Sequence, residues 1–233
     1  MEEKIGDGVA RVCVFDVNET LLDMGALDPH FERIFGEASA RPVWFDRFLQ
    51  LWLTETVTGS YQPFGQIAGL ALRMLAGERG VELSDDDEQS VIGGIASLPP
   101  HPEVEEGLRA LRGAGFRLAT LTNSTQKVAD AQIENSGLGE LFEMSLSADT
   151  AGRLKPAPEP YRMAAEALGV PVGGIRLVAA HGWDVVGAMR AGCAAAFVAR
   201  PGKALFPIAP PPDVVGADLR EVADGIIAAE WGG

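Results

Sequence analysis

A single carboxylate follows the first apolar run of the chain. Val12-Cys13-Val14-Phe15 is a β-type run that ends on Asp16, and polar residues then interrupt it before apolar character resumes at Leu21. In an α/β sheet, Asp16 would lie at the carboxyl end of a strand, which is the edge where open sheets bind their ligands. A carboxylate at that edge can attack an electrophile covalently, so Asp16 is a candidate nucleophile.

Other polar groups follow later strand-like runs in the same way. Each of them alone could simply cap a helix or lie in a turn. Because the carboxyl ends of parallel strands meet at one edge of the sheet, their recurrence at successive ends predicts a shared site. The residues are Thr122, Asn123, Lys155, His181 and Asp184.

The second half of the chain alternates strand-like and helix-like segments. This alternation is typical of βαβ units and predicts an α/β protein with a parallel sheet. Strands are expected at 116–122, 142–147, 175–180 and 194–198, and helices at 126–136, 158–168, 183–191 and 219–230.

The segment 24–98 interrupts this pattern, because it contains several helix-like stretches and no convincing strand. The stretch from Val43 to Leu53 is apolar nearly all round, which predicts burial on more than one side. Ser84 and Asp87 form a plausible capping box. We therefore expect an inserted helical cap at 24–98 and an α/β core made of 1–23 and 99–233.

Composition narrows the classes of partner. The 233 residues carry a formal net charge of -14, which argues against nucleic acid or an anionic membrane as the main partner. Cys13 and Cys193 lie in apolar runs and are expected to be structural thiols. The acidic start of the chain and the absence of a membrane-spanning apolar run lead us to expect a cytoplasmic protein.

In order and spacing, these segments resemble the four motifs of the haloacid dehalogenase superfamily. They are Asp16 to Thr20, Leu121-Thr122-Asn123, Lys155-Pro156 and Ala179 to Asp184. Within that superfamily the chain is most similar to the L-2-haloacid dehalogenases, on the Thr-Asn pair, on Tyr161 after Lys-Pro, and on Gly187-Ala188 after Trp183-Asp184. The resemblance implies a Rossmann-like parallel sheet core with an inserted helical cap.

Asn18 helps to distinguish two reactions that the superfamily resemblance allows, phosphate hydrolysis and dehalogenation. Phosphatases of the superfamily use an acid two residues after the nucleophile to protonate the leaving group, and they hold magnesium with further carboxylates in the fourth motif. Here the first position is Asn18, and Ala179 and Ala180 precede His181. Halide leaves without a proton, and two acids make a poor magnesium site. We therefore expect no metal and no cofactor; Mg²⁺ would be required only if the protein were a phosphatase.

The resemblance also implies roles for single residues. Asp16 would attack the halogen-bearing carbon, and Lys155 would keep Asp16 ionised. Asp184 would either position the hydrolytic water or neutralise Lys155. Thr20, Thr122 and Asn123 could donate hydrogen bonds to the nucleophile or to the substrate carboxylate. The residues expected to contact the substrate are Asn18, Thr122, Asn123, Phe45, Phe64, Tyr161 and Trp183.

Three positions depart from the subgroup. The L-2-haloacid dehalogenases carry an arginine after the tryptophan of the first long cap helix, whereas Phe45 follows Trp44 here. His181 stands where Asn is usual, and it could be the hydrolytic base, a substitute halide donor, or a strand-end histidine bonded to backbone. Glu19 stands where many relatives have Gly.

The sequence thus predicts a hydrolase that removes halide from a small 2-haloalkanoic acid through an aspartyl ester, without metal. The alternatives are a phosphatase or phosphonate-type hydrolase with an altered metal site, and a catalytically weak binding relative. The apolar helix of the cap further suggests a homodimer, although packing of the cap on the core explains it nearly as well.

Overall fold

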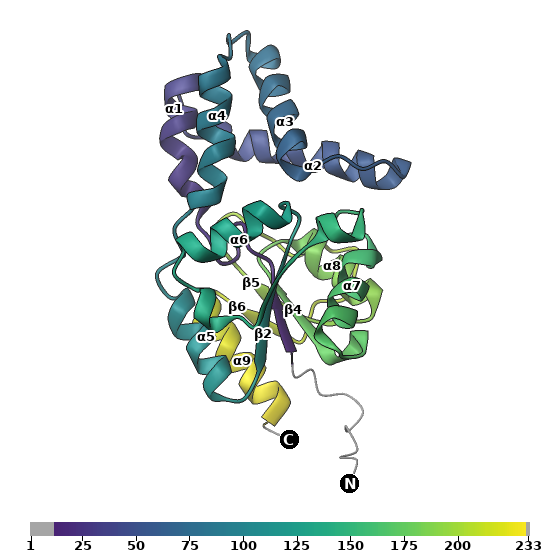
Figure 1. Cartoon of the computed structure of the whole chain (residues 1–233). Helices are drawn as coiled ribbons and strands as arrows, with labels where there is room; N and C mark the ends of the chain where they lie inside the picture. The colour runs from purple at the N-terminus through teal and green to yellow at the C-terminus, as the bar shows by residue number, and fades with distance from the viewer. Residues whose placement is uncertain (1–11, 232–233) are drawn as a thin grey trace.

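The computed structural model describes residues 12–231, which form a parallel sheet with helices on both faces and a helical cap above one edge (Figure 1). The sheet has six strands in the order β3-β2-β1-β4-β5-β6. They are β1 (Val12–Phe15), β2 (Arg117–Thr122), β3 (Met144–Ser147), β4 (Ile175–Ala179), β5 (Ala194–Val198) and β6 (Val214–Gly216). The predicted α/β class with an inserted cap is confirmed.

Strand β1 lies in the middle of the sheet and is buried on both faces. Val14 pairs with Ala119 of β2 and with Leu177 of β4. Alternate side chains of a strand point to opposite faces. Accordingly, Cys13 and Phe15 pack into one apolar cluster and Val12 and Val14 into another. A central position of this kind puts Asp16 between the carboxyl ends of both neighbouring strands.

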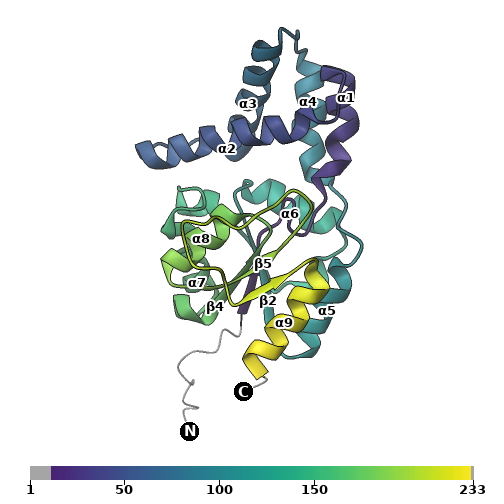
Figure 2. The same cartoon turned by 180° about the vertical axis from the view of Figure 1, so that it is seen from behind.

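The two helical layers differ in what they support. On one side α5 (Val104–Gly113) packs against α9 (Leu219–Trp231), and on the other α7 (Pro158–Leu168) packs against α8 (Gly182–Ala191), as Figure 2 shows from behind. Helix α6 (Gln126–Asn135) lies beside β3 near the cap. Both cysteines are buried and free, as expected of structural thiols.

The cap consists of α1 (Asp28–Phe35), α2 (Ala40–Thr58), α3 (Phe64–Arg79) and α4 (Asp85–Gly94). Helix α2 lies above the carboxyl edge of the sheet in both views (Figures 1 and 2). Its aromatic residues Trp44, Phe45, Phe48 and Trp52 are buried, and the Trp44 indole donates to the carbonyl of Ala68 in α3. Ser84 and Asp87 form the predicted capping box at the start of α4.

The expected strands and helices match the structure closely, but helix α5 (Val104–Gly113) and strand β6 were not predicted. The strand at Ala194–Val198 and the helix at Pro158–Leu168 have the predicted bounds, and most other ends differ by one or two residues. Strand β6 was missed because it is only three residues long and its middle residue, Val215, is exposed.

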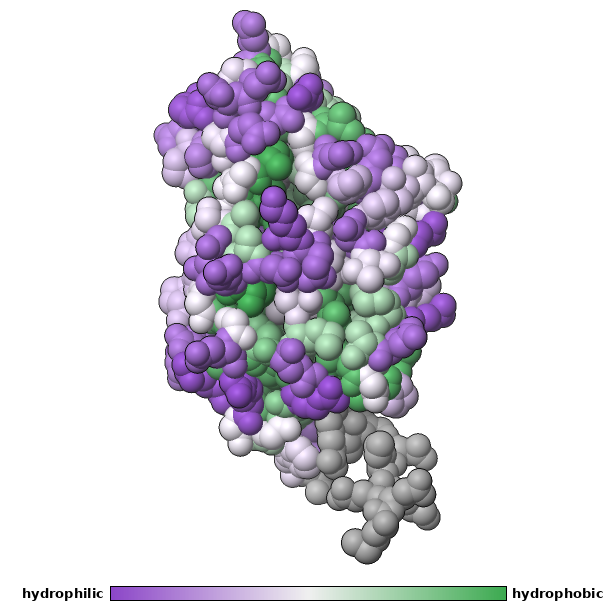
Figure 3. Space-filling view, viewed as in Figure 1, coloured by the Kyte–Doolittle hydropathy of each residue, from purple (hydrophilic) through white to green (hydrophobic). Residues whose placement is uncertain are grey.

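Hydrophilic residues are spread over both the cap and the core on the face seen in Figure 3, with apolar residues between them. Between residues 12 and 231, none of the helices combines the length and the apolar character that crossing a membrane requires. The cap-mediated homodimer and the cytoplasmic location stay predictions.

Gly187 allows α8 to approach the loop that carries Lys155. A Cβ atom at this position would lie 2.5 Å from Cβ of Pro156 and 2.7 Å from the Tyr161 hydroxyl. We expect Gly187→Ala to lower the free energy of unfolding by about 1–3 kcal/mol through overpacking, despite the better helix propensity of alanine.

Urea denaturation measures this change. The matched control is Gly77→Ala in α3, where an added Cβ meets no described atom within 4 Å, so this variant should be unchanged or slightly more stable. Equal stability of the two variants would contradict the close packing of α8 on Pro156.

Candidate active site

Lys155 is the centre of a buried cluster of charges at the carboxyl edge of the sheet. Its ammonium lies 3.0 Å from Asp16 Oδ1 and 2.5 Å from Asp184 Oδ2, and it donates to the carbonyl of Leu121 at 2.8 Å. The Lys155 side chain is completely buried. Three donor contacts satisfy an ammonium group, so this buried cation is fully paired.

Burial by itself would raise the pKa of the Asp16 carboxyl. The charge of Lys155 and the hydrogen bonds from His181 and Thr20 outweigh that effect, and the pKa of Asp16 lies below its usual value. Burial would likewise lower the pKa of Lys155, but the two carboxylates raise it. Asp16 is therefore ionised at neutral pH, as a nucleophile must be.

The second oxygen of Asp16 is held by two further donors. Thr20 Oγ1 donates to Oδ2 at 2.7 Å and itself accepts from the Ala180 amide at 2.9 Å, which directs its hydrogen toward Asp16. His181 Nδ1 lies 2.9 Å from the same oxygen. Oδ1 has one hydrogen-bonded donor among the described residues, and Oδ2 has two.

His181 connects Asp16 to a second carboxylate, that of Glu19. The other ring nitrogen, Nε2, lies 2.8 Å from Glu19 Oε2. The ring is stacked between Phe45 and Trp183, with centroid distances of 5.5 and 5.0 Å. Burial would lower the pKa of His181, but its bonds to Asp16 and Glu19 raise it to about 9. His181 is a cation at neutral pH.

Glu19 is also contacted by two basic residues. Lys203, in the loop after β5, forms an ion pair with Glu19 Oε2, and Arg41 of α2 lies 3.4 Å from Oε1. Burial would raise the pKa of Glu19, yet His181 and Lys203 lower it to about 2. Charges therefore alternate in sign from the interior to the surface, in the order Asp184, Lys155, Asp16, His181, Glu19 and Lys203.

Several predicted substrate-contacting residues support neighbouring side chains in the structure. Asn123 exchanges two hydrogen bonds with the backbone of Lys155, and Tyr161 donates to Asp184 Oδ1 at 2.5 Å. The amide oxygen of Asn18 accepts from Gln132 of α6, and Thr122 Oγ1 accepts from the Ser124 amide. These contacts fix Lys155, Asp184 and the loops around Asp16.

The charged cluster is covered on the side of the cap by an aromatic wall, which consists of Phe45, Trp52, Phe64 and Trp183. Trp52 of α2 packs against Phe64 of α3 and against Trp183 of α8, with centroid distances of 5.2 and 5.4 Å. Phe45 and Phe64 are at most 7% exposed. Among residues 12–231, the buried indole nitrogens of Trp52 and Trp183 have no hydrogen-bond partner.

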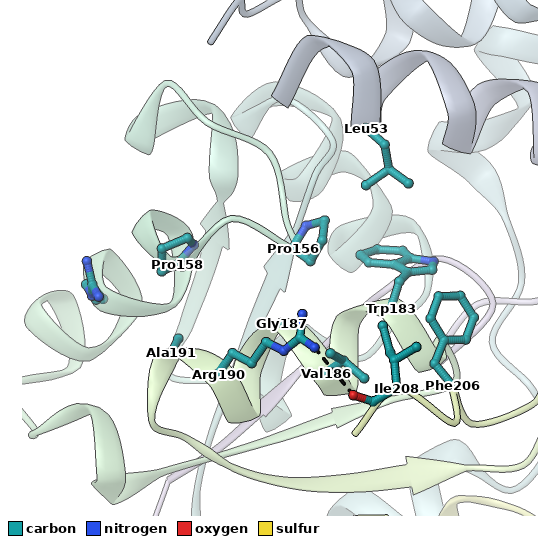
Figure 4. A pocket seen from close by; sticks show the side chains of 11 residues that line it. Leu53, Pro156, Pro158, Trp183, Val186, Gly187, Arg190, Ala191, Phe206 and Ile208 are labelled. Atoms are coloured by element: carbon teal, nitrogen blue, oxygen red, sulfur yellow. Dashed lines mark hydrogen bonds between the residues drawn. The ribbon is translucent and has the colours of Figure 1, made fainter. Parts of the chain in front are cut away.

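Two pockets lie along the boundary between cap and core. One of about 390 Å³ lies under Leu53 of α2 and beside Trp183, with Arg190 and Phe206 on its far side (Figure 4). The other, of about 370 Å³, is lined by Phe64, Ile95 and Ser124. Asp16 lines neither pocket, but Trp183 and Phe64 of the aromatic wall each line one of them.

The residues around Asp16 do not fit a magnesium site. The two carboxylates that could share a metal ion are already bridged by the Lys155 ammonium. Asn18, which replaces the usual acid, is bonded to Gln132. In the described part of the chain, no three His, Cys, Asp or Glu side chains are arranged to hold a metal.

Comparison with known proteins agrees with this geometry. The profile of the haloacid dehalogenase-like hydrolases matches residues 10–179, so the chain belongs to that family of hydrolases. Over 90% of its length it is 29% identical to an (S)-2-haloacid dehalogenase of Pseudomonas sp. (strain YL), covering 91% of that protein. It is also 29% identical to haloacetate dehalogenase H-2 of Moraxella sp. (strain B), over 85% of this chain and 90% of the relative.

Solved structures give the same result. The L-2-haloacid dehalogenase of Xanthobacter autotrophicus with covalently bound chloropropionic acid superposes with a TM-score of 0.84 at 25% identity. The match covers 92% of this chain and 97% of that structure.

Sequence reasoning named most of the cluster but gave no role to Glu19 and overlooked Lys203. Lys203 follows β5 and could have been found by the rule that located Lys155 and His181, since it too lies after the carboxyl end of a strand. The two arginines of α2 near Phe45 are paired with carboxylates other than Asp16. Arg47 pairs with Glu78 of α3, and Arg41 with Asp28 and Glu19.

The charge on His181 gives stability a definite pH dependence. The pKa of His181 in the folded protein is about 9, whereas the pKa of a histidine in the unfolded chain is near the usual 6.5. The stabilisation is therefore complete below pH 6.5 and is lost as the pH rises to 9, by at most about 3 kcal/mol.

Urea denaturation between pH 6 and 9 tests this dependence. The free energy of unfolding should decline in the wild type, and the difference from His181→Asn should shrink with rising pH. A difference that stays constant over this range would mean that His181 is neutral in the folded protein.

Proposed function

We propose that this hydrolase removes halide from small 2-haloalkanoic acids, with Asp16 as nucleophile and without a metal ion. The observation that carries the proposal is the Lys155 ammonium between Asp16 and Asp184, which keeps the nucleophile ionised by a side chain of the protein itself. The named relatives, (S)-2-haloacid and haloacetate dehalogenases, support the substrate class.

The reaction has two covalent steps. Asp16 Oδ1, which has the fewer donors, attacks the halogen-bearing carbon, a carbon–oxygen bond forms and halide leaves with the bonding electrons. Water then adds to Cγ of Asp16, and the ester breaks to give a 2-hydroxy acid. The solved structure of a relative with covalently bound chloropropionic acid supports an ester intermediate of this kind.

The surroundings of Asp16 suit both ends of such a substrate. The aromatic wall offers an apolar surface for the halogen, and the indole N–H groups of Trp52 and Trp183 are free to donate to an anion within the described structure. Thr122 lies at the end of β2, the strand next to β1, and its hydroxyl is a donor for the substrate carboxylate. We assign residues 24–98 as the cap that closes this site and 1–23 with 99–233 as the core.

Halide release tests the proposal. With chloroacetate or 2-chloropropionate and excess EDTA, the wild type should release halide, measured by ion chromatography, and Asp16→Asn should release none. The control is Asp130→Asn, an exposed carboxylate on α6, which should keep wild-type activity. A pure, folded wild type that releases no halide from a panel of such acids would refute the proposal, and hydrolysis only with Mg²⁺ and a phosphate ester would favour the phosphatase.

Isotope labelling tests the covalent step. In a single turnover in H₂¹⁸O, the label should enter the peptide that contains Asp16, because water attacks the carboxyl carbon of the ester. Mass spectrometry of the digested protein measures this incorporation. Label found only in the 2-hydroxy acid would mean that water attacks the substrate directly.

A further inference from the structure

His181 contacts both the nucleophile, Asp16, and a second carboxylate, that of Glu19. Both ring nitrogens of His181 face carboxylate oxygens, at 2.9 Å in Asp16 and 2.8 Å in Glu19. A carboxylate can only accept hydrogen bonds, so both nitrogens carry hydrogen and the ring is an imidazolium. This geometry does not suit a general base, which would need a free ring nitrogen.

The position of Nδ1 relative to Asp16 indicates what the cation does. Alkylation of Oδ1 leaves Oδ2 as the carbonyl oxygen of the ester, and Oδ2 is the atom that His181 and Thr20 contact. When water adds to Cγ, the π electrons of the carbonyl move onto Oδ2. Donors already aimed at an oxygen where negative charge develops stabilise that transition state.

Glu19 has a larger effect in the ester intermediate than in the free enzyme. Once Asp16 is esterified it is no longer an anion, and within residues 12–231 Glu19 is then the carboxylate still bonded to His181. The imidazolium would lose its proton more readily without Glu19. Lys203 and Arg41 in turn pair with Glu19, and Phe45 and Trp183 fix the plane of the ring.

The backbone conformation at Glu19 is one that favours glycine, which indicates that the Glu19 side chain has a role of its own. Glu19 has a φ of 62°, in the left-handed region. Within residues 12–231, no other residue except glycine has a positive φ. A side chain in this conformation brings Cβ too close to the following carbonyl oxygen, so the conformation is strained. Glycine would avoid that strain, but it could not supply the carboxylate that contacts His181.

We propose that Glu19 is a positioning residue that keeps His181 doubly protonated, and that the Nδ1–H of His181 stabilises the oxyanion on Asp16 Oδ2 during hydrolysis of the ester. This proposal rests on the function proposed above. The tetrahedral intermediate re-forms its carbonyl and breaks the Cγ–Oδ1 bond. One proton of water passes to the departing alkoxide and the other is released, which leaves Asp16 ionised again.

Rapid-quench kinetics with 2-chloropropionate separate the two covalent steps. Halide appearing in the first turnover measures ester formation, and the mass of the Asp16 peptide follows ester decay. In Glu19→Gln the halide burst should remain near one per site, while ester decay at pH 8 slows tenfold or more and the ester accumulates. The control Glu37→Gln removes a surface ion pair with Arg79 and should leave both constants unchanged.

The pH profile of ester decay distinguishes this role from a merely structural one. The charged and titratable groups around His181 are Asp16, Glu19, Lys203, Arg41, Lys155 and Asp184. Ester decay in the wild type should fall as the pH rises through the loss of the His181 proton. Glu19→Gln should move this fall to lower pH by a unit or more, because the remaining carboxylate partner is removed.

The variant Lys203→Met should shift the pH at which ester decay falls in the direction opposite to Glu19→Gln. It also tests the proposal if Glu19→Gln does not fold. Loss of a cation beside Glu19 makes the imidazolium harder to deprotonate, so the fall should move to higher pH. Decay that rises with pH, or a fall unmoved in these variants, would overturn the proposal for Glu19. Absence of halide release from the wild type itself would instead overturn the proposed function on which it rests.

Discussion

The structure of the site depends on one buried cation shared by two buried carboxylates. Lys155 lies between Asp16 and Asp184, which follow β1 and β4, and it reaches back to the Leu121 carbonyl on β2. Removing these charges from water is costly, and the cost is offset only when every donor and acceptor is paired. The Tyr161 hydroxyl of α7 donates to the second oxygen of Asp184, and the Asn123 amide holds the backbone of Lys155, so the central strand ends, α7 and α8 are all connected to Lys155.

The helical cap makes these charges effective by keeping water away from them. Trp52 and Phe45 of the cap pack on Trp183 and His181 of the core. The charge pairs therefore lie in a medium of low polarity, where electrostatic interactions are strong. Phe45 illustrates the arrangement. It occupies the position where the L-2-haloacid dehalogenases carry an arginine, and it contributes an apolar face to the imidazolium of His181 and to the Lys203 ammonium.

The sequence was sufficient to predict the sheet, the cap and the set of strand-end residues. These features follow from local patterns and from the rule that parallel strands end at one edge. It could not predict that Tyr161 and Asn123 support other side chains, because that depends on how α7 and the Lys155 loop pack. It also gave no role to Glu19, since nothing local shows that a residue beside the nucleophile turns toward a histidine 162 positions later.

The positive charges next to Asp16 lie in the core and not in the cap. His181 and Lys155 both belong to the core, and both are bonded to Asp16. In this chain the cap supplies Arg41 to Glu19 through a 3.4 Å contact, and otherwise an aromatic surface. The cations that hold Asp16 ionised are therefore side chains of the core, while the cap contributes the apolar surroundings in which they act.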